Sequence, residues 1–159
     1  MIKGLHHNAY RCRDSEETRK FYEDFLGLPL ASALPIKTTQ TGRQANVLHT
    51  FYEMGDGSYL AFFEAPDQPF EFKDQHDLDL HIALEVDRAT LEHMFARARS
   101  AGIETRGVSD HGFIDSIYLR DPNGYVIELT TRTADDHEDL DRGRARRILD
   151  EWQQAKTAA

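Results

Sequence analysis

The chain has 159 residues, a length typical of one compact domain with a core of its own. Its 19 lysines and arginines are outnumbered by 28 aspartates and glutamates, and the net charge of −9 without a basic block argues against nucleic acid as a partner. No stretch is apolar enough for a membrane span or a signal peptide, and the single cysteine, Cys12, can form no disulfide within the chain. We therefore expect a cytoplasmic protein that acts on a small molecule and has no nucleic-acid or membrane partner.

The first half of the chain is typical of a strand, a helix and further strands. A short apolar strand at about 5–10 runs into Asp14, a residue typical of a helix N-cap, and Gly27 is typical of the end of that helix. Strand-like runs follow at 45–54 and 59–65, with a glycine-containing turn between them.

The second half repeats this order after a polar and aromatic linker at 66–78. An apolar strand at 80–84 runs into Asp87, and a helix with apolar residues at helical spacing ends at Gly102. Strand-like runs follow at 113–119 and 125–130. The repetition indicates that the domain contains two copies of one structural unit.

Two copies of a strand, a helix and about three strands predict an α+β fold built from two βαβββ modules. We place this domain at 1–131, with modules at about 2–65 and 79–131. Residues 132–159 are typical of an acidic turn followed by a C-terminal helix. Its apolar residues, Leu140, Ala145, Ile148, Leu149 and Trp152, fall on one stripe, which must pack either on its own body or on a partner subunit.

Three residues at matching places in the repeat indicate a metal site. His7 and His81 lie on the first strand of each module, and alignment of the two closing glycine turns places Glu128 opposite Ala61. Because strand side chains alternate, Glu128 points away from its apolar neighbours, and a buried carboxylate there needs a cation or a proton. Two imidazoles and one carboxylate form the facial triad that suits Fe(II), our first choice, or Mn(II), our second.

Four stretches of the chain resemble the vicinal oxygen chelate superfamily. They are His7 to Asp14, Phe21 to Leu28, His81 to Asp87 and Asp121 to Leu129, and the resemblance covers about residues 2–131. It implies paired βαβββ modules that form an incomplete barrel around one divalent metal, and single-domain members that pair as homodimers. The family includes glyoxalase I, fosfomycin-resistance transferases, methylmalonyl-CoA epimerase, bleomycin-binding proteins and extradiol ring-cleaving dioxygenases.

Departures from the family patterns guide the choice among these activities. Glyoxalase I and the epimerase use a fourth protein ligand where this chain has Ala61, and Glu64 nearby has the wrong strand parity to replace it. Tyr118 precedes Glu128 by ten residues, the spacing of an active-site tyrosine in extradiol enzymes, and His111 matches their His-Gly stretch loosely.

The sequence therefore predicts an extradiol-type dioxygenase that cleaves a catecholic substrate with Fe(II) and molecular oxygen, with Tyr118 and His111 as catalytic residues. Arg11 shares strand parity with the predicted ligand His7 and is predicted to bind an anionic group of the substrate. Two alternatives stay open: a glyoxalase-like lyase or isomerase, and a small-molecule binding or resistance protein of the same fold.

Overall fold

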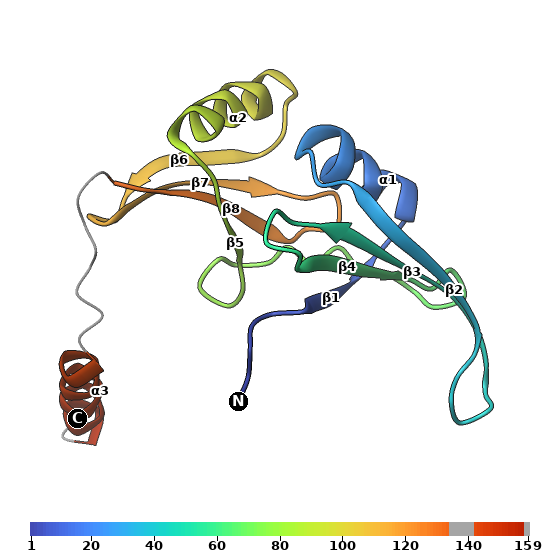
Figure 1. Ribbon diagram of the computed structural model, residues 1–159, viewed down its shortest axis with the longest axis horizontal. Helices are drawn as coiled ribbons and strands as arrows, with labels where there is room; N and C mark the ends of the chain where they lie inside the picture. Colours follow the sequence, from blue (N-terminus) through green and yellow to red (C-terminus); the bar gives the residue numbers. More distant parts are fainter. Residues whose placement is uncertain (134–141, 158–159) are drawn as a thin grey trace.

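The computed structural model describes residues 1–133 and 142–157, so the predicted acidic turn and Leu140 lie outside the described residues. It contains two four-stranded sheets side by side, each with a helix on the same side (Figure 1). The first module comprises β1 (His7–Cys12), α1 (Ser15–Arg19) with a π-helical continuation (Lys20–Phe25), β2 (Leu30–Thr38), β3 (Gln44–Glu53) and β4 (Tyr59–Glu64). The second comprises β5 (Ile82–Glu85), α2 (Arg88–Ser100), β6 (Thr105–Asp110), β7 (Ile114–Arg120) and β8 (Val126–Arg132), and α3 (Arg142–Thr157) follows. The predicted α+β fold of two βαβββ modules with a C-terminal helix is confirmed, and the two sheets of one chain do not close into a barrel.

Both sheets have the same strand order, β1-β4-β3-β2 and β5-β8-β7-β6. In each module the first strand therefore pairs in parallel with the last strand. Phe51 pairs with Ala61 in the first sheet, and Tyr118 pairs with Glu128 in the second. These registers agree with the alignment of the closing turns, which made Ala61 and Glu128 equivalent.

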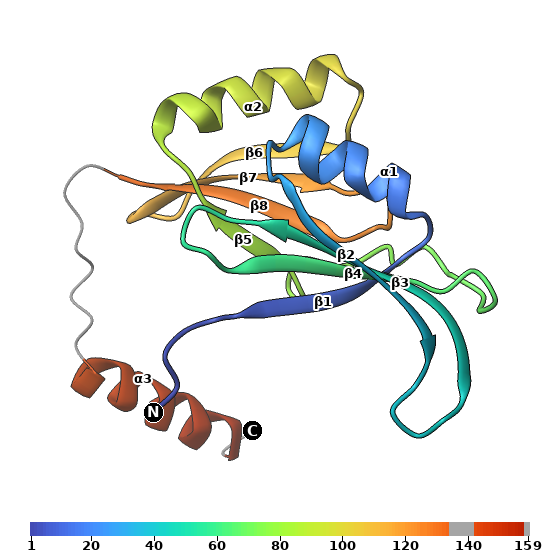
Figure 2. The same ribbon diagram turned by 45° about the vertical axis from the view of Figure 1, so that its right-hand side comes forward.

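Both helices begin at the acidic residues that the sequence indicated. The side chain of Asp14 accepts a hydrogen bond from the backbone N–H of Glu17 (2.8 Å), and Asp87 accepts one from that of Thr90 (2.7 Å). The helices cover one side of the sheets, where the apolar core lies. Its largest fully buried side chains are Tyr22, Tyr52, Phe62, Leu60, Leu91, Ile117, Leu119 and Ile127. We call the other sides of the two sheets the open faces, because neither α1 nor α2 covers them (Figure 2).

The turn between β7 and β8 joins the two modules through buried polar contacts. The hydroxyl of Tyr22, in the first module, donates to the carboxylate of Asp121 (3.0 Å). The hydroxyl of Tyr125 donates to the backbone oxygen of Arg11 (2.9 Å). Burial raises the pKa of the Asp121 carboxyl above its usual value and also raises that of the Tyr22 hydroxyl. The turn therefore holds the position of one sheet relative to the other.

Glycine is required at position 124 of this turn, where the linker passes. The residue has φ +94°, and a Cβ there would lie 2.7 Å from the backbone nitrogens of Lys73 and Asp74. The backbone N–H of Lys73 donates to the oxygen of Asn123 (2.9 Å), so the linker is fastened to the second module.

Helix α3 stands apart from both sheets, on the side of the open faces, in the two views of Figures 1 and 2. None of the described helices combines the length and the apolar character needed to cross a bilayer.

Candidate functional site

His81 and Glu128 lie together on the open face of the second module. Nδ1 of His81 lies 2.7 Å from the backbone oxygen of Asp77. A carbonyl oxygen can only accept, so Nδ1 carries the proton and donates it. The other ring nitrogen, Nε2, lies 3.1 Å from Oε2 of Glu128, a residue that is only 4% exposed. A neutral imidazole and a carboxylate would bring two lone pairs together here, so the contact needs a cation, either a proton or a metal ion, and the donor set fits a divalent metal.

Tyr118 connects this pair to His111. Its hydroxyl donates to Oε1 of Glu128 over 3.3 Å and lies 3.0 Å from Nε2 of His111. Because the hydroxyl has one proton and the carboxylate takes it, Nε2 of His111 donates to the hydroxyl oxygen. Burial, and then the charge of Glu128, raises the pKa of Tyr118 above its usual value of 10. The tyrosine is therefore a hydrogen-bond donor and not a phenolate at neutral pH.

Arg106 supplies the positive charge beside Tyr118. Its guanidinium carbon lies 4.6 Å from the centre of the Tyr118 ring, and it forms an ion pair with Asp77 that lowers the pKa of the aspartate. Asp77 thus holds two groups of the site, since its carbonyl binds His81 and its carboxylate binds Arg106. A cavity of about 270 Å³ opens between these residues and the linker.

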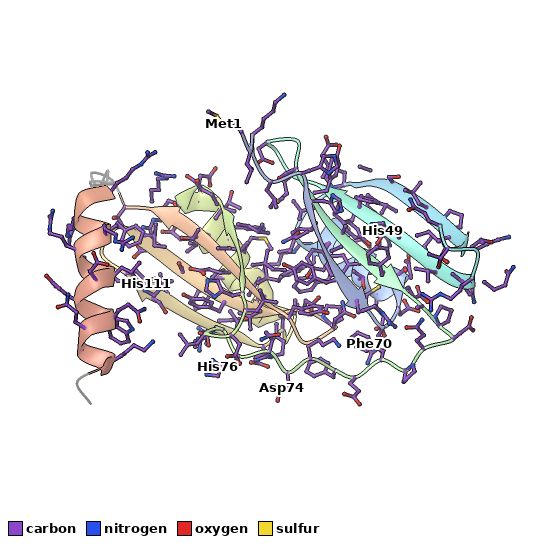
Figure 3. All side chains as sticks on the ribbon, turned by 90° about the horizontal axis from the view of Figure 1, so that it is seen from below. Met1, His49, Phe70, Asp74, His76 and His111 are labelled. Carbon is purple, nitrogen blue, oxygen red and sulfur yellow. The ribbon has the colours of Figure 1, made fainter. Side chains whose placement is uncertain are left out.

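His7 lies on the open face of the first module, among aromatic rings. Its ring centre is 5.5 Å from that of Phe51 and 6.2 Å from that of His49, which stacks on Phe63 at 3.6 Å. Figure 3 views the molecule from the open side and shows His49 on the first sheet and His111 at the second. Any ligand at His7 would therefore have an aromatic wall beside it.

A single chain does not bring His7 to His81 and Glu128. Over residues 1–133 and 142–157, no three His, Cys, Asp or Glu side chains come close enough together to hold a metal ion. Glu64 accepts a hydrogen bond from the backbone N–H of Ser15 (2.8 Å), at the start of α1. Its side chain therefore points away from the open face, as its strand parity predicted. Arg11 donates to the side-chain oxygen of Gln68 (3.2 Å) at the start of the linker.

Comparisons with known proteins bear on this arrangement. Residues 4–129 match the model of the Glyoxalase/Bleomycin resistance protein/Dioxygenase superfamily. The chain belongs to this superfamily. Its curated relatives include the metallothiol transferase FosB of Shouchella clausii, 27% identical over 139 residues that cover 84% of this chain and 83% of the relative.

Two solved structures of the superfamily share the fold. The glyoxylase/bleomycin resistance protein/dioxygenase domain from Frankia sp. EAN1pec is 15% identical with a TM-score of 0.68, and the match covers 84% of this chain and 100% of that one. A point mutant of the fosfomycin resistance protein FosX of Listeria monocytogenes, complexed with Mn(II) and 1S,2S-dihydroxypropylphosphonic acid, is 20% identical with a TM-score of 0.62. That match covers 84% of this chain and 95% of FosX.

Sequence reasoning missed Arg106, Asp77 and Phe51 as neighbours of the predicted superfamily site. Arg106 lies on β6, which carries no apolar alternation, and Asp77 acts partly through its backbone carbonyl, which no side-chain pattern reveals. Phe51 could have been found, because the alignment that equates Ala61 with Glu128 also equates Phe51 with Tyr118.

Proposed function

We propose that the protein is a metal-dependent enzyme that acts on a small, anionic, oxygen-bearing substrate. It would add a nucleophile, such as water or a thiol, to the substrate and open a carbon–oxygen bond. The carrying observation is the contact of 3.1 Å between His81 Nε2 and Glu128 Oε2, which needs a cation. The names of the relatives, a metallothiol transferase and a fosfomycin resistance protein crystallised with Mn(II), support this alternative better than a dioxygenase.

The proposed metal ligands are His81 and Glu128 of one copy and His7 of a second copy. Each chain exposes His7 and His81 on open faces that α1 and α2 do not cover, and His7 forms no metal-binding group with His81 and Glu128 within the described residues of one chain. A homodimer that sets the first module of one copy against the second module of the other would complete the site twice. Mn(II) is the first ion to test, and when bound it would polarise a substrate oxygen as a Lewis acid.

The remaining groups bind the substrate and control protons. With a metal ion on the Glu128 carboxylate, the hydroxyl proton of Tyr118 would be free to turn from Glu128 to a substrate oxygen that gains charge, while His111 holds the hydroxyl oxygen in place. Arg106 is placed to contact an anionic substituent, and Arg11 stays a predicted second contact on the first module.

Subunit mixing tests the shared site. His7→Ala and Glu128→Gln should each bind almost no metal alone, because every site in either homodimer lacks one ligand. A mixed dimer would have one intact and one doubly defective site, so an equimolar random mixture should regain about a quarter of the parental metal content. Mixing His7→Ala with His7→Ala is the control. No recovery in the mixture would overturn the shared site.

Substrate assays test the reaction class. The Mn(II)-loaded protein is incubated with fosfomycin and either water or a thiol such as L-cysteine, and the products are followed by phosphorus NMR. A new diol or thioether signal supports the proposal.

Ring cleavage of a catechol is the second candidate, favoured by the 3.0 Å contact between His111 and Tyr118. Oxygen uptake by the Fe(II)-loaded protein with a panel of catechols, without any reaction of fosfomycin, would make ring cleavage the first candidate. If the protein isomerised a glutathione hemithioacetal and catalysed neither of the other two reactions, a glyoxalase-like isomerase would replace both candidates.

A further inference from the structure

Helix α3 carries an apolar stripe that the described residues of its own chain leave exposed. Ile148, Leu149 and Trp152 are 54%, 50% and 65% exposed, although their spacing places them on one side of the helix. A helix of this length obtains most of its stability from packing. The stripe therefore needs a partner surface.

The position of α3 points toward the uncovered side of the sheets. In Figures 1 and 2 the helix lies on the side opposite α1 and α2 and apart from both sheets. The open face of the first module is also exposed there, with Leu34 of β2, which pairs with His49, 50% exposed. One partner molecule on this side would cover both the stripe and the open face.

Charge selects a second copy of this chain as that partner. Helix α3 has five basic and two acidic side chains, whereas the whole chain has a net charge of −9. The rest of the chain is therefore more acidic than the whole, and a basic helix is attracted to the body of another copy.

We propose that α3 of one copy packs on the first module of a second copy and fastens the dimer. The choice of the first module rests on the proposed function. If His7 of the second copy approaches His81 and Glu128 of the first copy, the first module of the second copy lies against the second module of the first copy. Helix α3 of the first copy continues from that second module. Docking of α3 on the second copy, by contrast, does not need a metal.

Trp152 is the only tryptophan in the chain, so its fluorescence reports on α3 directly. In a dilution series of the full chain, emission should be blue-shifted in the dimer. It should move to the red over the same concentrations at which sedimentation shows dissociation. A blue-shifted monomer would mean that α3 packs on its own body, and red emission from an intact dimer would mean that nothing covers it. Either result overturns the proposal.

Paired variants locate the contact. Ile148→Gln with Leu149→Gln should shift the emission to the red and weaken dimerisation by about tenfold or more, because the stripe loses its apolar surface. Gln153→Ala, which leaves the stripe intact, should change neither. If the stripe variant dimerises like the parent with unchanged emission, the helix does not fasten the dimer.

The acceptor surface and a membrane alternative are tested separately. Leu34→Gln should shift the Trp152 emission of the dimer to the red, whereas Leu78→Gln in the linker should not, and an inert Leu34→Gln would exclude this acceptor. Phosphatidylcholine vesicles with a quarter phosphatidylglycerol should leave the emission unchanged, and a blue shift with dissociation of the dimer would favour a lipid surface instead. Because Glu128→Gln removes a metal ligand and leaves α3 intact, its emission in metal-free buffer should match that of the metal-free parent. Failure of the metal site and failure of the helix contact are thus distinguishable.

Discussion

The hydroxyl of Tyr118 stands between an imidazole that donates to it and a buried carboxylate that accepts from it. The same carboxylate faces His81, whose other ring nitrogen is fixed by a backbone carbonyl. The hydrogen-bond partners of His111, Tyr118 and His81 thus determine where each of these side chains carries its proton. The hydroxyl oxygen of Tyr118 is therefore held in place before a substrate arrives, and only its proton has to turn from Glu128 to the substrate, a small reorganisation that is compatible with electrostatic stabilisation.

Removing this hydroxyl should slow the reaction much more than it weakens binding. For Tyr118→Phe we expect kcat to fall about a hundredfold or more, because a donor to a developing negative charge contributes roughly 2.7–4 kcal/mol. Steady-state kinetics with the substrate that the assays identify would measure it. Tyr10→Phe, which removes a hydroxyl bonded to Asn8, should stay within a few-fold of the parent. A fully active Tyr118→Phe would reduce the role of this tyrosine to packing.

The raised pKa of Tyr118 gives a pH prediction with a definite sign. A phenol whose pKa lies above 10 keeps its proton through the alkaline range, so its donor function is not lost as the pH rises toward 10. The ratio of parental to Tyr118→Phe rates should therefore be constant between about pH 7 and pH 9. A ratio that falls toward one across this range would show that the hydroxyl ionises earlier.

At the scale of elements, the turn between β7 and β8 is the contact on which the two modules depend. It buries Asp121 against the hydroxyl of Tyr22 and carries Gly124, over which the linker passes. The same turn leads into β8, which holds Glu128 in register with Tyr118. A disturbance of the turn would therefore reach the site through the backbone.

Loss of the Tyr22 hydroxyl should destabilise the chain measurably. We expect Tyr22→Phe to lower the free energy of unfolding by about 1.5–3 kcal/mol, the range for a buried hydrogen bond to a charged group. Tyr10→Phe, which breaks a bond between neutral groups, should cost about 0.5–1.5 kcal/mol. Urea denaturation would compare them, and an equal loss in both variants would show that Asp121 gains little from Tyr22.

Burial of Asp121 has its own pH signature. Its pKa is raised in the folded chain, so the folded state binds more protons than the unfolded one between about pH 4 and the folded pKa. The contribution of this carboxyl to stability is therefore greatest at low pH and falls as the pH rises through that window. Subtracting the unfolding curve of Asp121→Asn from that of the parent should show this slope, and a difference that rises with pH would contradict it.

At the scale of the whole molecule, the groups of the proposed site are divided between two open faces. His7 and its aromatic neighbours occupy one face, and His81, Glu128 and Tyr118 occupy the other. A second copy that covers the faces would bring the halves together. Metal binding and dimerisation then become linked equilibria, in which each strengthens the other.

This linkage can be measured. Mn(II) should lower the dissociation constant of the dimer, and a chelator should raise it, because in the proposed arrangement only the dimer would offer all three ligands. Analytical ultracentrifugation of a dilution series with and without Mn(II) would report the change. Glu128→Gln should dimerise independently of Mn(II). A parent protein with the same insensitivity would contradict the shared site.

The predictable parts of the fold are those with local chemical signals. The caps at Asp14 and Asp87 locate two helices, and apolar strand-like runs locate the six strands β1, β3, β4, β5, β7 and β8 in the sequence. Strands β2 and β6 were not located. Both lie at sheet edges, where one side of the strand has no partner, and their sequences contain Pro35 and Gly107 in place of regular alternation.

Part of the candidate site could be predicted for the same reason. Strand parity and spacing placed His81, Tyr118 and Glu128 together, and the structure brings them into contact. The expectation that His7 converges with them assumed that equivalent strands of one chain meet at a pseudo-two-fold axis. The sheets lie side by side instead, and no pattern in one sequence shows how two open faces are covered.

The parallel pairing of first and last strands also sets an order of events during synthesis. Strand β1 leaves the ribosome first but has no neighbour until residues 59–64 have been made, and β5 waits in the same way for 127–130. Tyr22 likewise waits for its partner Asp121, which emerges shortly before residues 127–130. The nascent chain must therefore keep early apolar segments unpaired while most of its length is translated, and contacts of such long sequence separation form slowly. A chaperone that binds the emerging N-terminal strand would act on this chain at the stage when it is most exposed to aggregation.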